Sequence, residues 1–107
     1  VGESVQDFRF KGVKYEFFSA FALNDQFAAF ISDDIDLKRK TDRLYELVEQ
    51  IPDKRDREII IKRYGLYNQK ELTQREIAAE MGISRSYVSR IEKRVLEELK
   101  GKFEAKR

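Results

Sequence analysis

The 107-residue sequence contains no cysteine and no histidine, and its single proline is Pro52. Without cysteine, the chain can form neither a disulfide framework nor a thiolate zinc site. Without histidine, it lacks the most frequent general base and the most frequent metal ligand. We therefore predict a protein that is not an enzyme and that needs no metal or other cofactor.

Long hydrophobic runs are also missing. No apolar stretch approaches the roughly 20 residues that are needed to span a bilayer. The stretch from Val1 to Phe10 has neither the basic lead nor the continuous apolar core of a secretory signal. We expect a cytoplasmic protein.

Charge is distributed unevenly along the chain. Residues 1–50 contain seven basic and ten acidic side chains, whereas residues 51–107 contain fifteen basic and ten acidic ones. A basic half suits a polyanionic partner, although a well-solvated surface explains this modest asymmetry about equally well.

Residues 1–31 form an aromatic-rich segment of unknown role. Alternation of apolar and polar residues on both sides of Lys11-Gly12 predicts a β-hairpin there, and Asn24 or Asp25 is placed to cap a short helix. Its aromatic residues favour a small core or packing on the rest of the chain, and if exposed they would form a docking surface. They are Phe8, Phe10, Tyr15, Phe17, Phe18, Phe21, Phe27 and Phe30.

Residues 32–40 (SDDIDLKRK) are predicted to be a charged linker. Its carboxylates, Asp33, Asp34 and Asp36, are compatible with metal ligands. A role in capping a helix and solubilising the linker is the favoured interpretation.

Residues 41–107 have a helical pattern almost to the end. Leu44, Leu47, Val48 and Ile51 recur at helical spacing, and Pro52 ends this first helix. A second helix is predicted between the cap Asp53 and the terminator Gly65, followed by a polar loop over 66–72.

The clearest pattern in the chain begins at Thr73. Thr73 and Glu76 form a capping box at the start of a short helix, and Gly82 permits a sharp turn. Ser84 caps a last helix that extends to about Lys100. The inward residues of the two helices are Ile77, Ala78, Met81, Val88, Ile91, Val95, Leu96 and Leu99. The expected fold is mainly α: a small bundle of four helices in roughly sixty residues, with a carboxy-terminal helix-turn-helix.

The outer face of this helix pair carries the candidate functional residues. The amino-terminal part of a helix in the major groove contacts base edges, and arginine and serine side chains suit that role. Base reading is therefore assigned to Arg85, Ser86, Ser89 and Arg90. Backbone contacts are assigned to Thr73, Gln74, Arg75, Lys93 and Arg94, the first three at a helix start suited to phosphate. Glu92 is interpreted as a surface charge with no further role.

The segment from about Leu44 to Leu99 resembles region four, the carboxy-terminal domain of bacterial sigma factors, and most of all those of sporulation. The residues that carry the resemblance are RDREIIIKRYGL (55–66) and TQREIAAEMGISRSYVSRIEKRVLEEL (73–99). It implies a transcription initiation factor that reads a minus-35-type promoter element together with core RNA polymerase. Ser86 stands where housekeeping members have an acidic residue, and Ser89 replaces a basic one, which favours a different promoter sequence.

The resemblance also implies partners. It places contacts with the flap of the polymerase beta subunit on the apolar faces of the first two helices, at Leu44, Leu47, Ile60 and Tyr64. The same surface would equally suit an anti-sigma protein. Residues 1–40 do not resemble the upstream promoter-melting domain, so we expect a fragment, a split factor, a stand-alone domain or a fusion.

Two other functions remain open at this stage. One is a stand-alone dimeric helix-turn-helix regulator in which residues 1–31 dimerise or sense a signal, which predicts a palindromic operator. The other is a fragment of a site-specific recombinase, which is disfavoured because no nucleophile precedes the helix pair in a recognisable catalytic context.

Overall fold

The computed structural model describes residues 9–10, 13–14 and 34–105. The described helices are α3 (Asp34–Glu49), α4 (Lys54–Tyr64), α5 (Gln74–Met81) and α6 (Arg85–Ala105), with a 3-10 turn η2 (Leu66–Asn68) after α4. The predicted four-helix, mainly α architecture of the carboxy-terminal part is confirmed.

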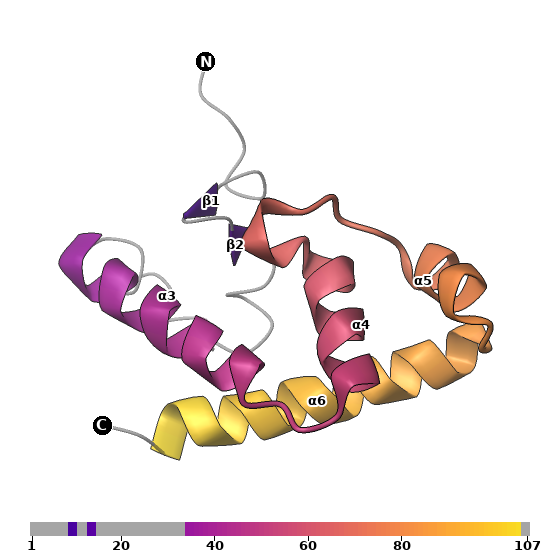
Figure 1. Ribbon diagram of the computed structural model, residues 1–107. Coiled ribbons are helices and arrows are strands. Elements are labelled where there is room, and N and C mark those ends of the chain that lie inside the picture. The colour runs from indigo at the N-terminus through magenta and orange to yellow at the C-terminus, as the bar shows by residue number, and fades with distance from the viewer. Residues whose placement is uncertain (1–8, 11–12, 15–33, 106–107) are drawn as a thin grey trace.

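Helix α6 is the helix on which the other described helices pack. It packs against α5 near its amino-terminal end, against α4 along its middle and against α3 towards its carboxy-terminal end (Figure 1). The core lies where these helices meet and contains Leu44, Leu47, Val48, Ile51, Ile59, Ile60, Tyr64, Leu66, Ile77, Ala78, Val88, Ile91, Val95 and Leu99. Every apolar residue predicted to face inward on the last two helices is buried or packed against this core.

Local signals set the start and end of α4 and the end of α3 as predicted. The Asp53 carboxylate accepts from the backbone N–H groups of Arg55 and Asp56 and caps α4. Gly65 ends α4 in the left-handed region at φ 61°, a conformation that costs a residue with a side chain about 1–2 kcal/mol. The break after α3 falls just before Pro52, which disfavours helical backbone at the preceding residue.

Two predicted helix boundaries and one predicted polar loop differ from the structure. Residues 34–40 are the first two turns of α3 and not a linker, because acidic residues followed by basic ones a turn later are as compatible with a helix as with a loop. Helix α6 continues to Ala105 and not to Lys100. The predicted polar loop 66–72 contributes a fully buried side chain, Leu66, to the core.

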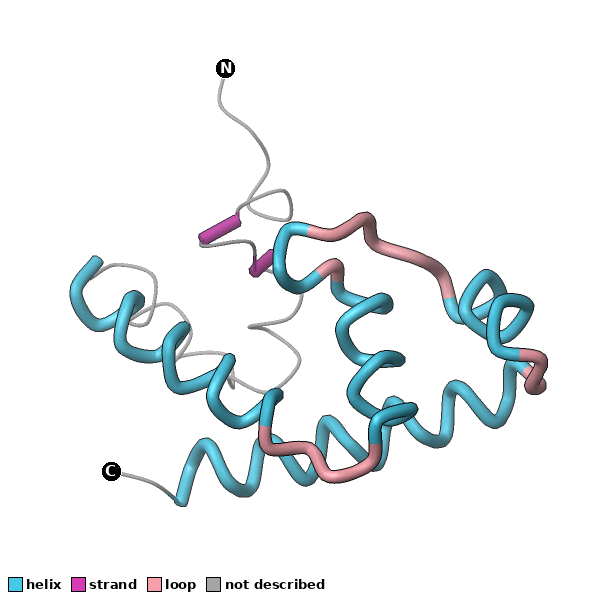
Figure 2. Tube along the Cα trace, viewed as in Figure 1, coloured by secondary structure: helices cyan, strands magenta, loops and turns pink. Residues whose placement is uncertain are grey.

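A hydrogen bond holds the loop between η2 and α5 against α4. The N–H of Leu72 donates to the carbonyl of Lys62 at 2.9 Å, and Leu72 packs against the core. Figure 2 shows this stretch as an extended loop that bridges α4 and α5. The start of α5 is thereby placed beside the end of α4.

Two short strands precede the helices. Strands β1 (Arg9–Phe10) and β2 (Val13–Lys14) pair antiparallel, with Phe10 opposite Val13. The rest of the predicted hairpin, and the predicted helix with Phe27 and Phe30, lie outside the described residues. Both stay predictions.

Candidate nucleic-acid interface

Three local features set the start of α5, the turn after it and the start of α6. Thr73 and Glu76 form the predicted capping box: Thr73 Oγ1 accepts from the Glu76 N–H at 3.1 Å, and the Thr73 N–H donates to Glu76 Oε1 at 2.9 Å. Gly82 is left-handed at φ 68°, with its N–H on the carbonyl of Ala78. Ser84 Oγ accepts from the Tyr87 N–H at 3.1 Å and caps α6. These contacts fix α5 and α6 as a helix-turn-helix.

The four predicted base-reading residues share one exposed face of α6. Arg85, Ser86, Ser89 and Arg90 line one surface hollow together with Gln74, while Val88 and Ile91 on the opposite face are buried. The structure therefore brings the predicted set together. Their contact with bases stays a prediction.

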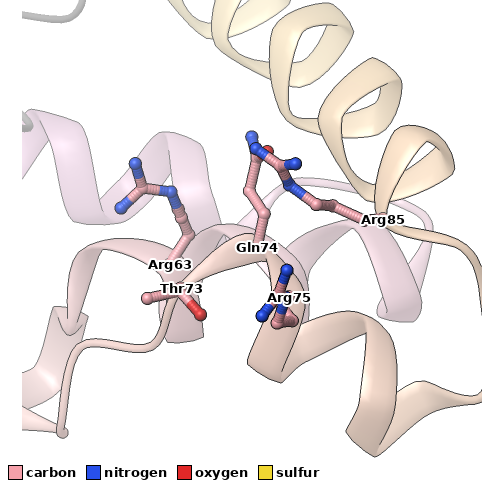
Figure 3. Close-up of a pocket in the computed structure, with 5 residues that line it drawn as sticks. All are labelled: Arg63, Thr73, Gln74, Arg75 and Arg85. Carbon is pink, nitrogen blue, oxygen red and sulfur yellow. The ribbon is translucent and has the colours of Figure 1, made fainter.

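The first residues of α5 border a second hollow. Figure 3 shows Thr73, Gln74 and Arg75 there with Arg85 from α6 and Arg63 from α4. Gln74 and Arg85 line both hollows, so the two form one continuous basic surface. Sequence reasoning missed Arg63, although its position one residue before the buried Tyr64 could have placed it at the edge of the core.

Glu92 is not the surface charge that we predicted. Only 8% of the residue is exposed, and its carboxylate accepts from Tyr64 Oη at 2.5 Å and from Gln74 Nε2 at 2.7 Å. Arg63 Nε lies 3.4 Å from Glu92 Oε1. A single carboxylate on α6 thus joins α4 to the first residue of α5.

Lys93 and Arg94, both assigned to the DNA backbone, differ in their surroundings. Both are exposed, but Arg94 Nη2 bonds Asp56 Oδ2 of α4 at 3.0 Å, and Asp56 is buried. The hydrogen bond to Asp56 raises the pKa of Arg94 above its ordinary value, because it stabilises the charged guanidinium. Any phosphate would have to compete with Asp56 for Arg94, and the assignment of both residues to DNA stays a prediction.

The assignment of polymerase contacts to Leu44, Leu47, Ile60 and Tyr64 needs correction. All four are buried in the core, with at most 5% of any residue exposed. An apolar helical stripe marks the inward face, and here that face packs on α6. These side chains hold the bundle together and are not available to a partner on the surface.

A contact that the sequence did not predict lies beside the reading residues. Arg55 Nη2 donates to Tyr87 Oη at 2.7 Å, and Arg55 Cζ lies 5.0 Å from the centre of the Tyr87 ring. The Cζ of Arg90 lies 5.7 Å from the same centre. Tyr87 is therefore in contact with two arginines, one of which is a predicted base reader.

Neither a metal centre nor a membrane span is found in the part of the chain that the structure describes. No three of its acidic side chains gather as metal ligands would. None of its helices is long and apolar enough to cross a membrane.

The fold and this surface define a helix-turn-helix domain. The family model described as "Sigma-70, region 4" matches residues 53–101. Residues 53–101 are therefore similar to a sigma-70 region 4 domain, in agreement with the sequence resemblance.

The relatives are sigma factors. The chain is 53% identical over 66 residues to the RNA polymerase sigma-28 factor of Bacillus thuringiensis subsp. kurstaki, covering 62% of the chain and 27% of that protein. It is 52% identical over 66 residues to the RNA polymerase sigma-K factor of Bacillus subtilis (strain 168), covering 62% of the chain and 22% of that protein. The chain thus spans about a quarter of the length of these relatives. No solved structure matches it.

Proposed function

We propose that the chain binds promoter DNA at a minus-35-type element, as part of a sigma factor that acts with core RNA polymerase. The observation that carries the proposal is the shared exposed face of Arg85, Ser86, Ser89 and Arg90 on the capped start of α6. A helix presented in this way fits the major groove. The chain acts by binding, in the cytoplasm, and without catalysis of its own.

The basic surface beside the reading face supports phosphate contacts. The amino-terminal end of α5 offers backbone N–H groups, and Arg63, Arg75 and Arg85 surround it (Figure 3). Few phosphates are neutralised by one such module, so the isolated chain binds weakly and its affinity falls with salt. Attachment to polymerase raises the effective concentration of the module at the promoter.

We place the polymerase contact, on the flap of the beta subunit, at the exposed edge of α3 and η2. Among the described residues, Tyr67 is the large apolar residue that is exposed. Its ring packs against the ring of Tyr45, with the ring centroids 4.7 Å apart. An anti-sigma protein would compete for the same edge. Tyr67→Asn keeps a residue that tolerates the left-handed backbone found here (φ 58°). The variant should weaken binding to polymerase and leave direct DNA binding unchanged.

The test of function is selection from a randomised duplex library at low and moderate salt, with and without core RNA polymerase. Selection of one asymmetric element in the presence of polymerase supports the proposal. Selection of a palindrome by the chain alone would instead establish the stand-alone dimeric regulator, since protein symmetry mirrors site symmetry.

A matched pair of variants assigns the selection to the reading face. Arg85→Ala and Lys102→Ala each remove one exposed cation from α6, at positions about 25 Å apart along the helix axis. Arg85→Ala should abolish preference at one base pair, whereas Lys102→Ala should leave the selected sequence unchanged. Equal effects of the two variants would contradict the assignment.

A further inference from the structure

Tyr87 occupies an unusual place on the reading helix. It lies in the first turn of α6, among the four exposed reading residues, yet it is half-buried and packs against the core. Its backbone N–H is bound to the cap Ser84. The backbone at Tyr87 is therefore fixed, and its ring lies between the core and the reading face.

Arg55, which lies on α4, contacts the side chain of Tyr87. The Arg55 guanidinium donates to Tyr87 Oη at 2.7 Å, across 32 residues of sequence. The backbone of Arg55 is itself anchored, because its N–H donates to the Asp53 carboxylate at 2.8 Å. Both ends of the Arg55–Tyr87 contact thus rest on helix caps.

Arg90 lies one turn further along α6, against the same ring. Its Cζ is 5.7 Å from the ring centre, within the range of a cation–π contact. In the described part of the chain, Arg90 forms no ion pair with a carboxylate. No carboxylate therefore occupies the N–H donors of its guanidinium. A long arginine side chain loses much rotamer freedom when it binds, and ordering it beforehand lowers that cost.

We propose that Tyr87 is a positioning residue for base recognition: its ring, braced by Arg55, holds the Arg90 guanidinium in a conformation ready for the DNA. The inference rests on the proposed function and specifies how one of its readers is prepared. It predicts that Tyr87 governs preference at the base pair that Arg90 reads and has little effect elsewhere in the element.

The test uses the 107-residue chain with core RNA polymerase, and the duplex that the wild-type chain selects under that condition. Tyr87→Leu removes the ring, and Tyr87→Phe keeps the ring but removes the bond from Arg55. Phe103→Leu is the matched control, because it removes a partly buried aromatic ring from the far end of the same helix. Base preference is measured position by position, and thermal unfolding confirms that each variant is folded.

Tyr87→Leu should reduce discrimination about threefold to tenfold at the base pair whose preference Arg90→Ala abolishes, as expected for loss of a cation–π contact. Tyr87→Phe should have a smaller effect at the same base pair, and Phe103→Leu none. In an Arg90→Ala background, Tyr87→Leu should have no further effect. If Tyr87→Leu does not fold, Tyr87→Phe and Arg55→Ala provide the same comparison.

Four results would overturn the inference. Unchanged preference in every Tyr87 and Arg55 variant would mean that the ring does not position Arg90. A uniform loss at all positions would indicate a structural role, and an effect that persists in the Arg90→Ala background would mean that Tyr87 contacts the DNA itself. A wild-type chain that selects no sequence even in the presence of core RNA polymerase would overturn the proposed function, and the inference with it.

Discussion

Gln74, the first residue of α5, donates its side-chain amide to the buried carboxylate of Glu92, two turns into α6. Gln74, one of the two residues that border both surface hollows, is thus held by a group inside the protein. Because the same carboxylate also accepts from Tyr64, the position of α5 on α6 depends on α4.

Glu92→Ala should lower the free energy of unfolding by about 2–3 kcal/mol, since it leaves the buried hydroxyl of Tyr64 and the partly buried amide of Gln74 without their acceptor. Urea denaturation measures the change. The control is Glu97→Ala, at an exposed glutamate of the same helix, which should stay within about 0.5 kcal/mol of the wild type. A loss as small as that of the control would show that the carboxylate does not join the helices.

Adjacent cations on α6 should behave differently. Arg94→Ala should cost about 1–2 kcal/mol of stability, because the buried carboxylate of Asp56 loses a charged donor. Lys93→Ala should leave stability unchanged and weaken DNA binding with a shallower salt dependence. Thermal unfolding and salt-dependent binding of the two variants provide the comparison, and equal stability losses would contradict the distinction.

Gly82→Ala isolates the cost of the left-handed turn. A Cβ at this position would meet nothing within 4 Å, so the change introduces backbone strain at φ +68° without a clash. We expect a loss of about 1–2 kcal/mol in the free energy of unfolding. Gly82→Asn should recover part of it, because asparagine tolerates this region better. Equal stability of the alanine and asparagine variants would argue against a conformational origin.

Tyr67 predicts a dependence of stability on alkaline pH. Its burial and then the neighbouring Glu49 raise the pKa of Tyr67 above 10.0, so the fold favours the neutral phenol. This contribution is fully present below the pKa of the unfolded chain and is lost as pH rises through the higher pKa of the folded protein. Unfolding measured from about pH 8 to 11 should therefore show a shallower alkaline loss for Tyr67→Phe than for the wild type. The same pH dependence of stability in the wild type and in Tyr67→Phe would contradict this prediction.

The features that sequence predicts well are those that neighbouring residues decide. The Thr73–Glu76 capping box and the left-handed Gly65 and Gly82 each depend on a few consecutive residues, and all three are found as expected. The grouping of Arg85 with Ser89, and of Ser86 with Arg90, follows from their spacing of four residues once the helix is recognised.

The features that sequence missed depend on contacts between distant segments. Nothing next to Glu92 in the chain indicates that Tyr64 and Gln74 will enclose it. For the same reason, helical spacing identifies Leu44 and Ile60 as an apolar stripe but cannot say that α6, and not a partner, covers it. The contact between Arg55 and Tyr87 likewise exists only after α4 and α6 have packed.

The 21-residue length of α6 has a mechanical consequence. At 1.5 Å per residue the helix is about 30 Å long, with Arg85 at one end and the contact between Arg43 and the carbonyl of Lys102 near the other. An α-helix of this length behaves as a stiff rod. A protein that binds α3 therefore also sets the tilt of α6, and with it the angle at which Arg85 and Arg90 approach a duplex.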